Sequence, residues 1–160
     1  MGSEMCIRDR EFPDLQGIAG AHYAQHDGEL AAVAEAIESH YYPRFAGDDL
    51  PQSAAATAVA LADRLDTLVG IFGIGQPPTG SKDPFALRRA SLAIIRMLIN
   101  LKAPLSLSDL LSSACEQHTA ELLPETAATV SHYILERLGN WYDESGIPVS
   151  YTHLTLPTKA

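Results

Sequence analysis

A cluster of basic side chains between residues 82 and 102 is the feature of this sequence best suited to bind a ligand. The segment contains Lys82, Arg88, Arg89, Arg96 and Lys102, against the single carboxylate of Asp83. The three arginines are spaced so that they share one side of a helix, and Lys82 precedes that helix, whose N terminus adds partial positive charge. The pattern predicts a phosphate-binding surface. A solvated helix face, or salt bridges to acids elsewhere in the chain, are the alternatives.

Acidic and histidine residues that could bind a metal are sparse. Asp63 and Asp66 share a helical face, but two carboxylates without further ligands make a poor cation site. The adjacent pair His26 and Asp27 is typical of metal-dependent phosphohydrolases, yet it precedes Gly28 in what is expected to be a surface turn. We therefore predict no metal site and no catalytic residue, and keep Asp63 and Asp66 as weak metal candidates. Pairing with a partner's positive charge, or capping, is the favoured role of Asp63.

Three further features have ordinary structural explanations. The loop at residues 75–82 resembles a phosphate-binding loop superficially, but Pro77 and Pro78 lack the N–H groups that such a loop needs. His40 is expected to be a hydrogen-bonded core residue. Cys115 is expected to be a small packing residue within a helix.

The elements that position these residues are all predicted to be helical. Apolar residues recur at intervals of three and four, and alternating β-branched runs are absent. The predicted helices span residues 15–24, 30–42, 53–72, 84–101, 108–118 and 124–141. Ser53 is the expected N-cap of the third helix, Asp83 followed by Pro84 begins the fourth, and Ser108 with Asp109 begins the fifth. The third helix carries an apolar stripe formed by Ala58, Leu61, Ala62, Leu65, Leu68, Val69 and Phe72.

Composition sets limits that agree with an all-α chain. Of its 160 residues, 46% are hydrophobic, and 20 acidic side chains against 11 basic ones give a formal net charge of −9. No stretch reaches the roughly 18 apolar residues of a membrane-spanning helix. Two cysteines exclude a disulfide scaffold and suit a reducing compartment. The acidic total argues against nucleic-acid binding by the whole surface, but leaves room for a local basic patch.

Both ends of the chain are expected to be non-native. Residues 5–9 can be encoded as ATG TGT ATA AGA GAC, whose reverse complement encodes residues 149–153. One DNA word in opposite orientation at the two ends is what a sequencing adapter leaves behind. We therefore expect residues 1–10 and 148–160 to be adapter-derived flanks, which removes Cys6 and leaves Cys115 as the only native cysteine.

Four long runs resemble the β subunits of bacterial glycyl-tRNA synthetases. They are EFPDLQG at residues 11–17, HYYPRFAGD at 40–48, ALADRLDTLVGIFGIG at 60–75 and GSKDPFALRRA at 80–90. The resemblance implies that residues 11–102 form an HD-like helical domain. Residues 103–147 would begin a C-terminal helical region related to anticodon-binding domains.

The same resemblance implies a division of labour. In this family the α subunit activates glycine with ATP and Mg²⁺, the β subunit binds tRNA(Gly), and the two form a cytoplasmic α2β2 assembly. Asp63 is similar to the last aspartate of the metal ligands in HD hydrolases. The His-Asp pair of those enzymes would precede Glu11, so hydrolase activity is not carried over, and no cofactor is expected in this segment.

The sequence thus predicts that Lys82, Arg88, Arg89 and Arg96 hold tRNA phosphates while another polypeptide does the chemistry. Two alternatives stay open. One is a metal-dependent phosphohydrolase built from Asp63, Asp66 and the pair at residues 26–27. The other is a structural module whose basic cluster meets an acidic face of the α subunit or of the β subunit itself. The prediction fails if neighbouring carboxylates neutralise all the guanidinium groups.

Overall fold

Helices are the only extended secondary-structure elements in the described part of the chain. The computed structural model describes residue 12 and residues 15–45, 47–79, 82–101, 103–119 and 121–144, so both predicted flanks and Lys102 lie outside the described residues. Within these ranges the helices are α2 (Ile18–His26), α3 (Ala31–Ser39), α4 (Ala54–Gly73), α5 (Leu87–Leu101), α6 (Leu107–Gln117) and α7 (Thr126–Glu144). An isolated bridge between Thr79 and Lys82 is the only β pairing among them. The predicted all-α class is confirmed.

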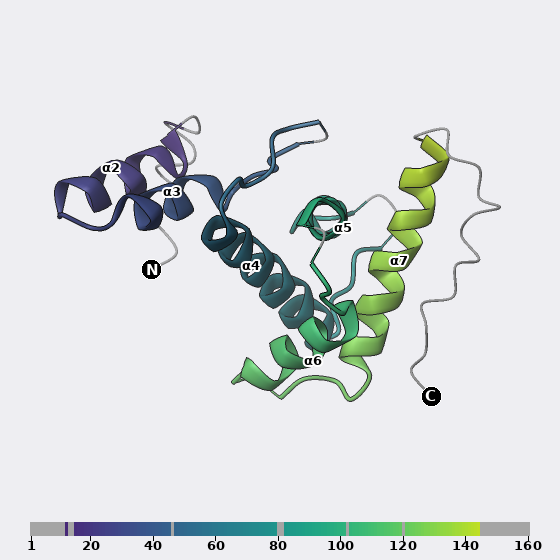
Figure 1. Ribbon diagram of the computed structural model, residues 1–160. Helices are drawn as coiled ribbons and strands as arrows, with labels where there is room; N and C mark the ends of the chain where they lie inside the picture. Colours follow the sequence, from purple (N-terminus) through teal and green to yellow (C-terminus); the bar gives the residue numbers. More distant parts are fainter. Residues whose placement is uncertain are drawn as a thin grey trace.

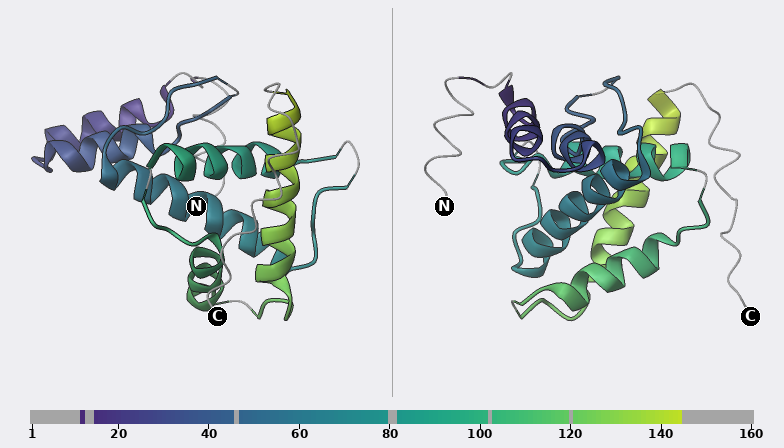
Figure 2. Two further views of the ribbon diagram at one scale, coloured as in Figure 1. Left: turned by 45° about the vertical axis from the view of Figure 1, so that its right-hand side comes forward. Right: turned by 60° about the vertical axis from the view of Figure 1, so that its left-hand side comes forward.

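The helices form a four-helix body and a projecting hairpin. Helices α4 to α7 pack on one another, and the antiparallel pair α2 and α3 extends from the N-terminal end of α4 (Figure 1). The hairpin meets the body through α3 and α4 alone among the described helices. The views in Figure 2 agree that it leaves the body on the side opposite α7.

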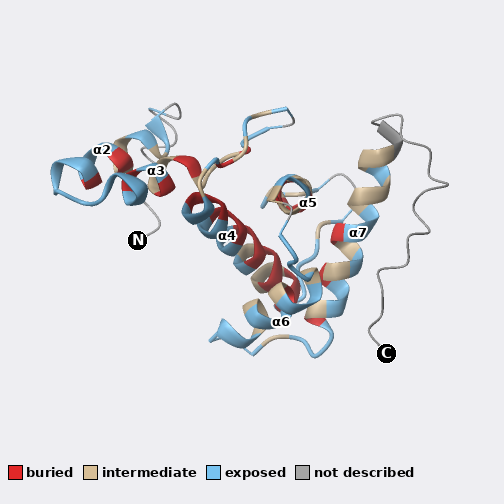
Figure 3. Cartoon of the chain, in the orientation of Figure 1, coloured by how far each residue is buried: buried red, intermediate tan, exposed pale blue. Residues whose placement is uncertain are grey.

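One hydrophobic core unites the body. Helix α4 contributes Leu65, Leu68 and Val69, and α5 contributes Ile94 and Met97. Buried side chains from α6 and α7 complete the same cluster: Leu111, Val130 and Ile134. Burial is concentrated along α4 (Figure 3). Because α6 and α7 pack on this core, residues 107–144 are held against α4 and α5; their relation to anticodon-binding domains stays a prediction.

The N terminus of α4 follows the sequence prediction, whereas that of α6 does not. The Ser53 hydroxyl accepts a hydrogen bond from the Ala56 N–H at 3.2 Å, as expected of an N-cap. In α6 the cap is Ser106, whose hydroxyl accepts from the Asp109 N–H at 3.3 Å. Ser106 has an extended backbone and lies three residues before Asp109, the spacing at which an N-cap hydroxyl reaches a helix N–H. Ser108 already lies inside the helix.

Helix α5 begins three residues later than predicted. Pro84 is not its first residue, because residues 84 and 85 form a turn and Ala86 takes a left-handed conformation with φ of 54°. Asp83 still caps the helix. Its two carboxylate oxygens accept from the Leu87 N–H at 2.8 Å and the Arg88 N–H at 3.0 Å.

The buried face of α4 differs in part from the predicted stripe. Ala58 and Ala62 are exposed, and they line a groove of about 430 Å³ against α6. Instead, Ala60 and Arg64 are buried, because α3 and the connection between α3 and α4 cover that side. Periodicity identified an apolar seam but could not show which edge of it a neighbouring element would cover.

The hairpin keeps a small core and an apolar exterior. Ala21, Ala24 and Ala34 are buried between its helices, with Ile37 against them. Its exposed large apolar side chains are Leu15, Ile18, Tyr23, Leu30 and Val33. Among the described residues, no helix has the length and apolarity needed to cross a membrane.

Candidate nucleic-acid interface

The basic residues predicted to bind phosphate are separated into two groups. Arg89 and Arg96 both reach the loop between α3 and α4, where Arg89 Nη1 donates to the Arg44 carbonyl at 2.9 Å and Arg96 Nη2 to the Asp48 carbonyl at 2.8 Å. Arg88 instead lies beside Tyr133 on α7. The sequence placed all three on one helix side, but the 100° between consecutive residues is enough to send Arg88 to another neighbour.

The charges of Arg89 and Arg96 are not cancelled locally. Their contacts are to carbonyl oxygens, and within the described ranges no carboxylate lies at ion-pair distance from either guanidinium. A carbonyl accepts a hydrogen bond without contributing a net charge, so each side chain keeps its full positive charge. Lys82 is exposed on the loop before α5. Among the described residues Arg89 and Arg96 have no carboxylate partner, so phosphate binding stays a prediction.

The single acid of the basic segment is already engaged. Both oxygens of Asp83 accept backbone N–H groups at the start of α5, as described above. A carboxylate at this position satisfies helix donors and interacts with the positive end of the helix dipole. Both of its oxygens are therefore engaged by the helix terminus.

Arg44 adds a fourth arginine that the sequence analysis did not single out. Its Nε lies 3.3 Å from Oδ2 of Asp48, and its backbone N–H donates to the same oxygen at 2.7 Å. Burial raises the pKa of Asp48, but the hydrogen bonds from Arg44 outweigh this effect and the pKa lies below its ordinary value. The loop is thus fixed internally by Asp48 and externally by Arg89 and Arg96. Arg44 joins the basic surface because its carbonyl accepts from Arg89 of α5. No sequence pattern predicts this contact between distant segments.

Arg88 lies in a different environment on the α7 side. Burial raises the pKa of the Tyr133 hydroxyl, while the charges of Arg137 and Arg88 lower it. The guanidinium of Arg137 stacks over the Tyr133 ring, 5.0 Å from its centroid. Two arginines therefore flank one half-buried tyrosine at the contact between α5 and α7.

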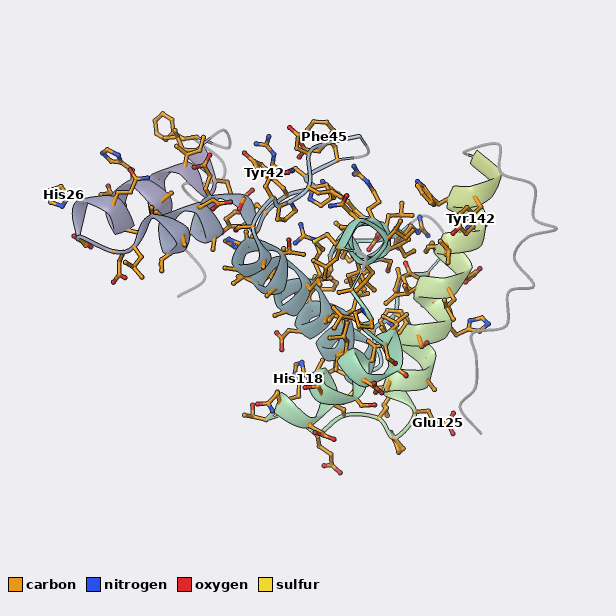
Figure 4. All side chains as sticks on the ribbon, in the orientation of Figure 1. His26, Tyr42, Phe45, His118, Glu125 and Tyr142 are labelled. Atoms are coloured by element: carbon orange, nitrogen blue, oxygen red, sulfur yellow. The ribbon has the colours of Figure 1, made fainter. Side chains whose placement is uncertain are left out.

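The candidate metal residues do not assemble into a site. Asp66 pairs with His118, whose Nε2 lies 3.1 Å from Oδ1 of the carboxylate. His26 and Asp27 form the exposed turn at the tip of the hairpin, far from His118 (Figure 4). The described residues contain no group of three or more histidine, cysteine or acidic side chains that could hold a metal ion. The turn interpretation of residues 26–28 is confirmed, with Gly28 at a φ of 82°.

Arg64 is a buried arginine with several hydrogen bonds that the sequence did not indicate. It is 9% exposed, and its guanidinium donates to the carbonyls of His40 at 2.8 Å, Tyr41 at 2.9 Å and Tyr42 at 3.0 Å. Burial lowers its pKa and the neighbouring Asp63 opposes that shift. These bonds hold the connection between α3 and α4, so Arg64 is structural. A buried arginine on a helix has no distinguishing sequence pattern.

The prediction for Cys115 agrees with the structure, whereas His40 is hydrogen-bonded as predicted but belongs to neither hydrophobic core. His40 is half-buried, and its Nδ1 lies 2.8 Å from the carbonyl of Ile37. Cys115 packs against the body core within α6. Burial raises the pKa of its thiol, and the charge of Glu116 adds to that effect. Neither residue belongs to the basic surface.

Comparison with known proteins gives one consistent result. The family described as glycyl-tRNA synthetase beta subunit matches residues 3–156. Glycine–tRNA ligase beta subunits of Marinobacter nauticus and of a Janthinobacterium species are 53% and 55% identical over 137 and 136 residues, which are 86% and 85% of this chain. That of Haemophilus influenzae is 49% identical over 147 residues, or 91% of this chain.

The match has a defined extent. The aligned regions are 20%, 19% and 21% of the three relatives, so this chain spans about a fifth of their length. The family match covers nearly the whole chain, including the four-helix body and the basic surface. On this evidence the chain belongs to the family of glycyl-tRNA synthetase β subunits.

Proposed function

We propose that this segment binds and positions tRNA(Gly) within a glycine–tRNA ligase and carries no catalytic group of its own. In that ligase an α subunit activates glycine with ATP and Mg²⁺, and the assembly is a cytoplasmic α2β2 tetramer. Residues 11–102 act as an HD-like helical domain without hydrolase activity. The observation that supports this role best is the uncompensated charge of Arg89 and Arg96, because guanidinium groups without carboxylate partners are available to phosphates.

The physical role of such a surface is orientation. Phosphate contacts fix the register and angle of an RNA without reading its sequence, and holding a substrate in a reactive geometry accelerates a reaction that other groups perform. Arg89, Arg96, Arg44 and the exposed Lys82 are the side chains best placed to make these contacts. Arg88 contributes from the α7 side.

The test is aminoacylation by the complete ligase at several salt concentrations. Each phosphate contact that is lost lowers the slope of log affinity against log salt by about 1. Arg89→Gln and Arg96→Gln should raise the KM for tRNA and flatten its salt dependence, and charge reversal at both Arg88 and Arg89 should do so more strongly. Arg137→Gln on α7 is the matched control and should leave the slope unchanged. Equal slopes for all these variants would reject the role.

A second role, as an interface module, is favoured by the apolar exterior of the hairpin. Leu30 is 73% exposed and Tyr23 is 63% exposed, which suits burial against another part of the ligase. Leu30→Ser and Tyr23→Ser should then weaken assembly of the ligase in sedimentation experiments without changing the salt slope for tRNA. If Lys82 crosslinks to protein rather than to tRNA, the basic surface itself belongs to such an interface.

A further inference from the structure

A pocket of about 240 Å³ opens beside the basic surface. It lies where the connection between α3 and α4, the middle of α4 and the start of α5 converge, and the side chains around it include Arg44, Asp63, Arg64, Phe85 and Arg89. Its volume is below the roughly 300–1,000 Å³ typical of pockets for drug-sized ligands. The pocket therefore suits one small planar group rather than an extended molecule.

Two kinds of wall border this pocket. Arg44 and Arg89 supply positive charge at its exposed rim. Phe85 supplies an aromatic ring that is 49% exposed. An aromatic ring beside arginine side chains is the combination that binds unpaired nucleotides, because bases stack on the ring and phosphates pair with the guanidinium groups.

Asp63 provides an acceptor at the same pocket. It is exposed, and no described cation lies at ion-pair distance from its carboxylate. The adjacent Arg64 directs its guanidinium toward backbone carbonyls. An ionised carboxylate only accepts hydrogen bonds, so Asp63 favours a group that offers N–H donors and disfavours a bare phosphate.

We propose that this pocket holds one unpaired nucleotide of the bound RNA. The base stacks on Phe85 and directs its N–H donors to Asp63, while the adjoining phosphate pairs with Arg44 and Arg89. Guanine is the preferred base, because its Watson–Crick edge carries an imino and an amino donor side by side. This inference rests on the proposed RNA-binding role and adds base recognition to it.

Substitution of Asp63 separates base recognition from simple electrostatics. If Asp63 only repels phosphate, Asp63→Asn should tighten RNA binding, as should Asp66→Asn, its matched control three residues along α4. If Asp63 accepts hydrogen bonds from a base, Asp63→Asn weakens binding instead. The probes are the hexaribonucleotides UUGUUU and UUUUUU, together with tRNA, bound to the complete ligase. Asp63→Asn should remove the preference for UUGUUU.

Substitution of Phe85 tests the stacking surface. Phe85→Ala should weaken tRNA binding by about fivefold or more, the lower end for loss of one stacked base, with an unchanged salt slope. Phe85→Leu keeps an apolar side chain without the ring and should weaken tRNA binding as much as Phe85→Ala. This result separates loss of stacking from a folding defect. Ile74→Ala, which removes another exposed apolar side chain at 53% exposure, is the matched control.

The results distinguish this inference from the role on which it rests. Weaker binding for the Asp63 and Phe85 variants, with normal salt slopes, supports the nucleotide pocket. If Asp63→Asn tightens binding as Asp66→Asn does, or Phe85→Ala behaves like Ile74→Ala, the pocket proposal is wrong, even where Arg89→Gln still flattens the slope. If Arg89→Gln also has no effect, the RNA-binding role fails with it.

Discussion

Arg64 offers the sharpest test of how the segment is held together. Its guanidinium joins α4 to the connection that leads from α3, through the carbonyls of His40, Tyr41 and Tyr42. A further bond, at 3.0 Å, reaches the Ala60 carbonyl within α4. Arg64→Met keeps much of the apolar volume of the side chain and removes all of these donors. We expect the hairpin and its connection to loosen while the four-helix body stays intact.

The magnitude follows from the three carbonyls of the connection that accept from Arg64 at 3.0 Å or less. A buried acceptor that loses its partner costs about 1–3 kcal/mol. Since this connection borders the open pocket beside Phe85, water can reach the abandoned carbonyls, and the lower end of that range applies. Three acceptors at about 1 kcal/mol each give a local loss of about 3 kcal/mol, or roughly a hundredfold change in the opening equilibrium.

Hydrogen exchange in the complete β subunit measures this local opening. Amides of α3 and residues 40–42 should exchange roughly a hundredfold faster in Arg64→Met, while those of α5 and α7 keep their rates. Arg44→Met is the comparison variant, because it removes one ion pair to Asp48, worth about 1 kcal/mol or less, and a contact over the Tyr42 ring worth about 0.5–1 kcal/mol. Its effect on residues 40–42 should therefore be smaller than that of Arg64→Met. If the two variants exchange alike, Arg64 does not hold the connection and the reasoning is wrong.

Three further predictions concern single positions. Gly73→Ala should lower stability by about 1–3 kcal/mol in thermal unfolding, because the added Cβ would overlap the Leu122 side chain, whose Cβ and Cγ would both lie 3.2 Å away; an unchanged midpoint would contradict this packing. Asp83→Ala should cost about 1 kcal/mol through the lost α5 cap, seen as faster exchange in the first turn of α5, whereas Asp83→Asn should retain part of the protection. The Cys115 thiol should react with iodoacetamide more slowly than glutathione at pH 8, because burial and Glu116 raise its pKa and reduce the thiolate fraction. The difference in rate should narrow as the pH rises, and equal rates at pH 8 would contradict the prediction.

The sequence predicted the helices best where local signals agreed. Helix α4 combines a Ser53 cap, a long apolar seam and a glycine-rich end, and its observed bounds differ from the prediction by one residue at each end. The start of α5 was predicted three residues too early, because Asp83 followed by Pro84 is a typical helix start. The left-handed Ala86, which depends on the folded turn, delays the helix.

The site was harder to predict than the helices because its contacts are between distant segments. Residue spacing showed that Arg88, Arg89 and Arg96 share a helix, but it could not show that two of them reach the loop around Asp48 and the third faces Tyr133. The same limit hid Arg44, which lies 45 residues from Arg89 along the chain. Periodicity describes one helix, whereas a binding surface depends on its neighbours.

The partners of Arg89 and Arg96 explain how one set of side chains can both stabilise the fold and attract RNA. Had these arginines paired with carboxylates, the loop would be held but the positive charge would be neutralised. Because they donate to the carbonyls of Arg44 and Asp48, the loop is held and the charge remains. A substitution that removes either guanidinium therefore changes both properties at once. Arg89→Lys keeps the charge while weakening the geometry, so comparing it with Arg89→Gln by salt slope separates loss of charge from loss of loop position.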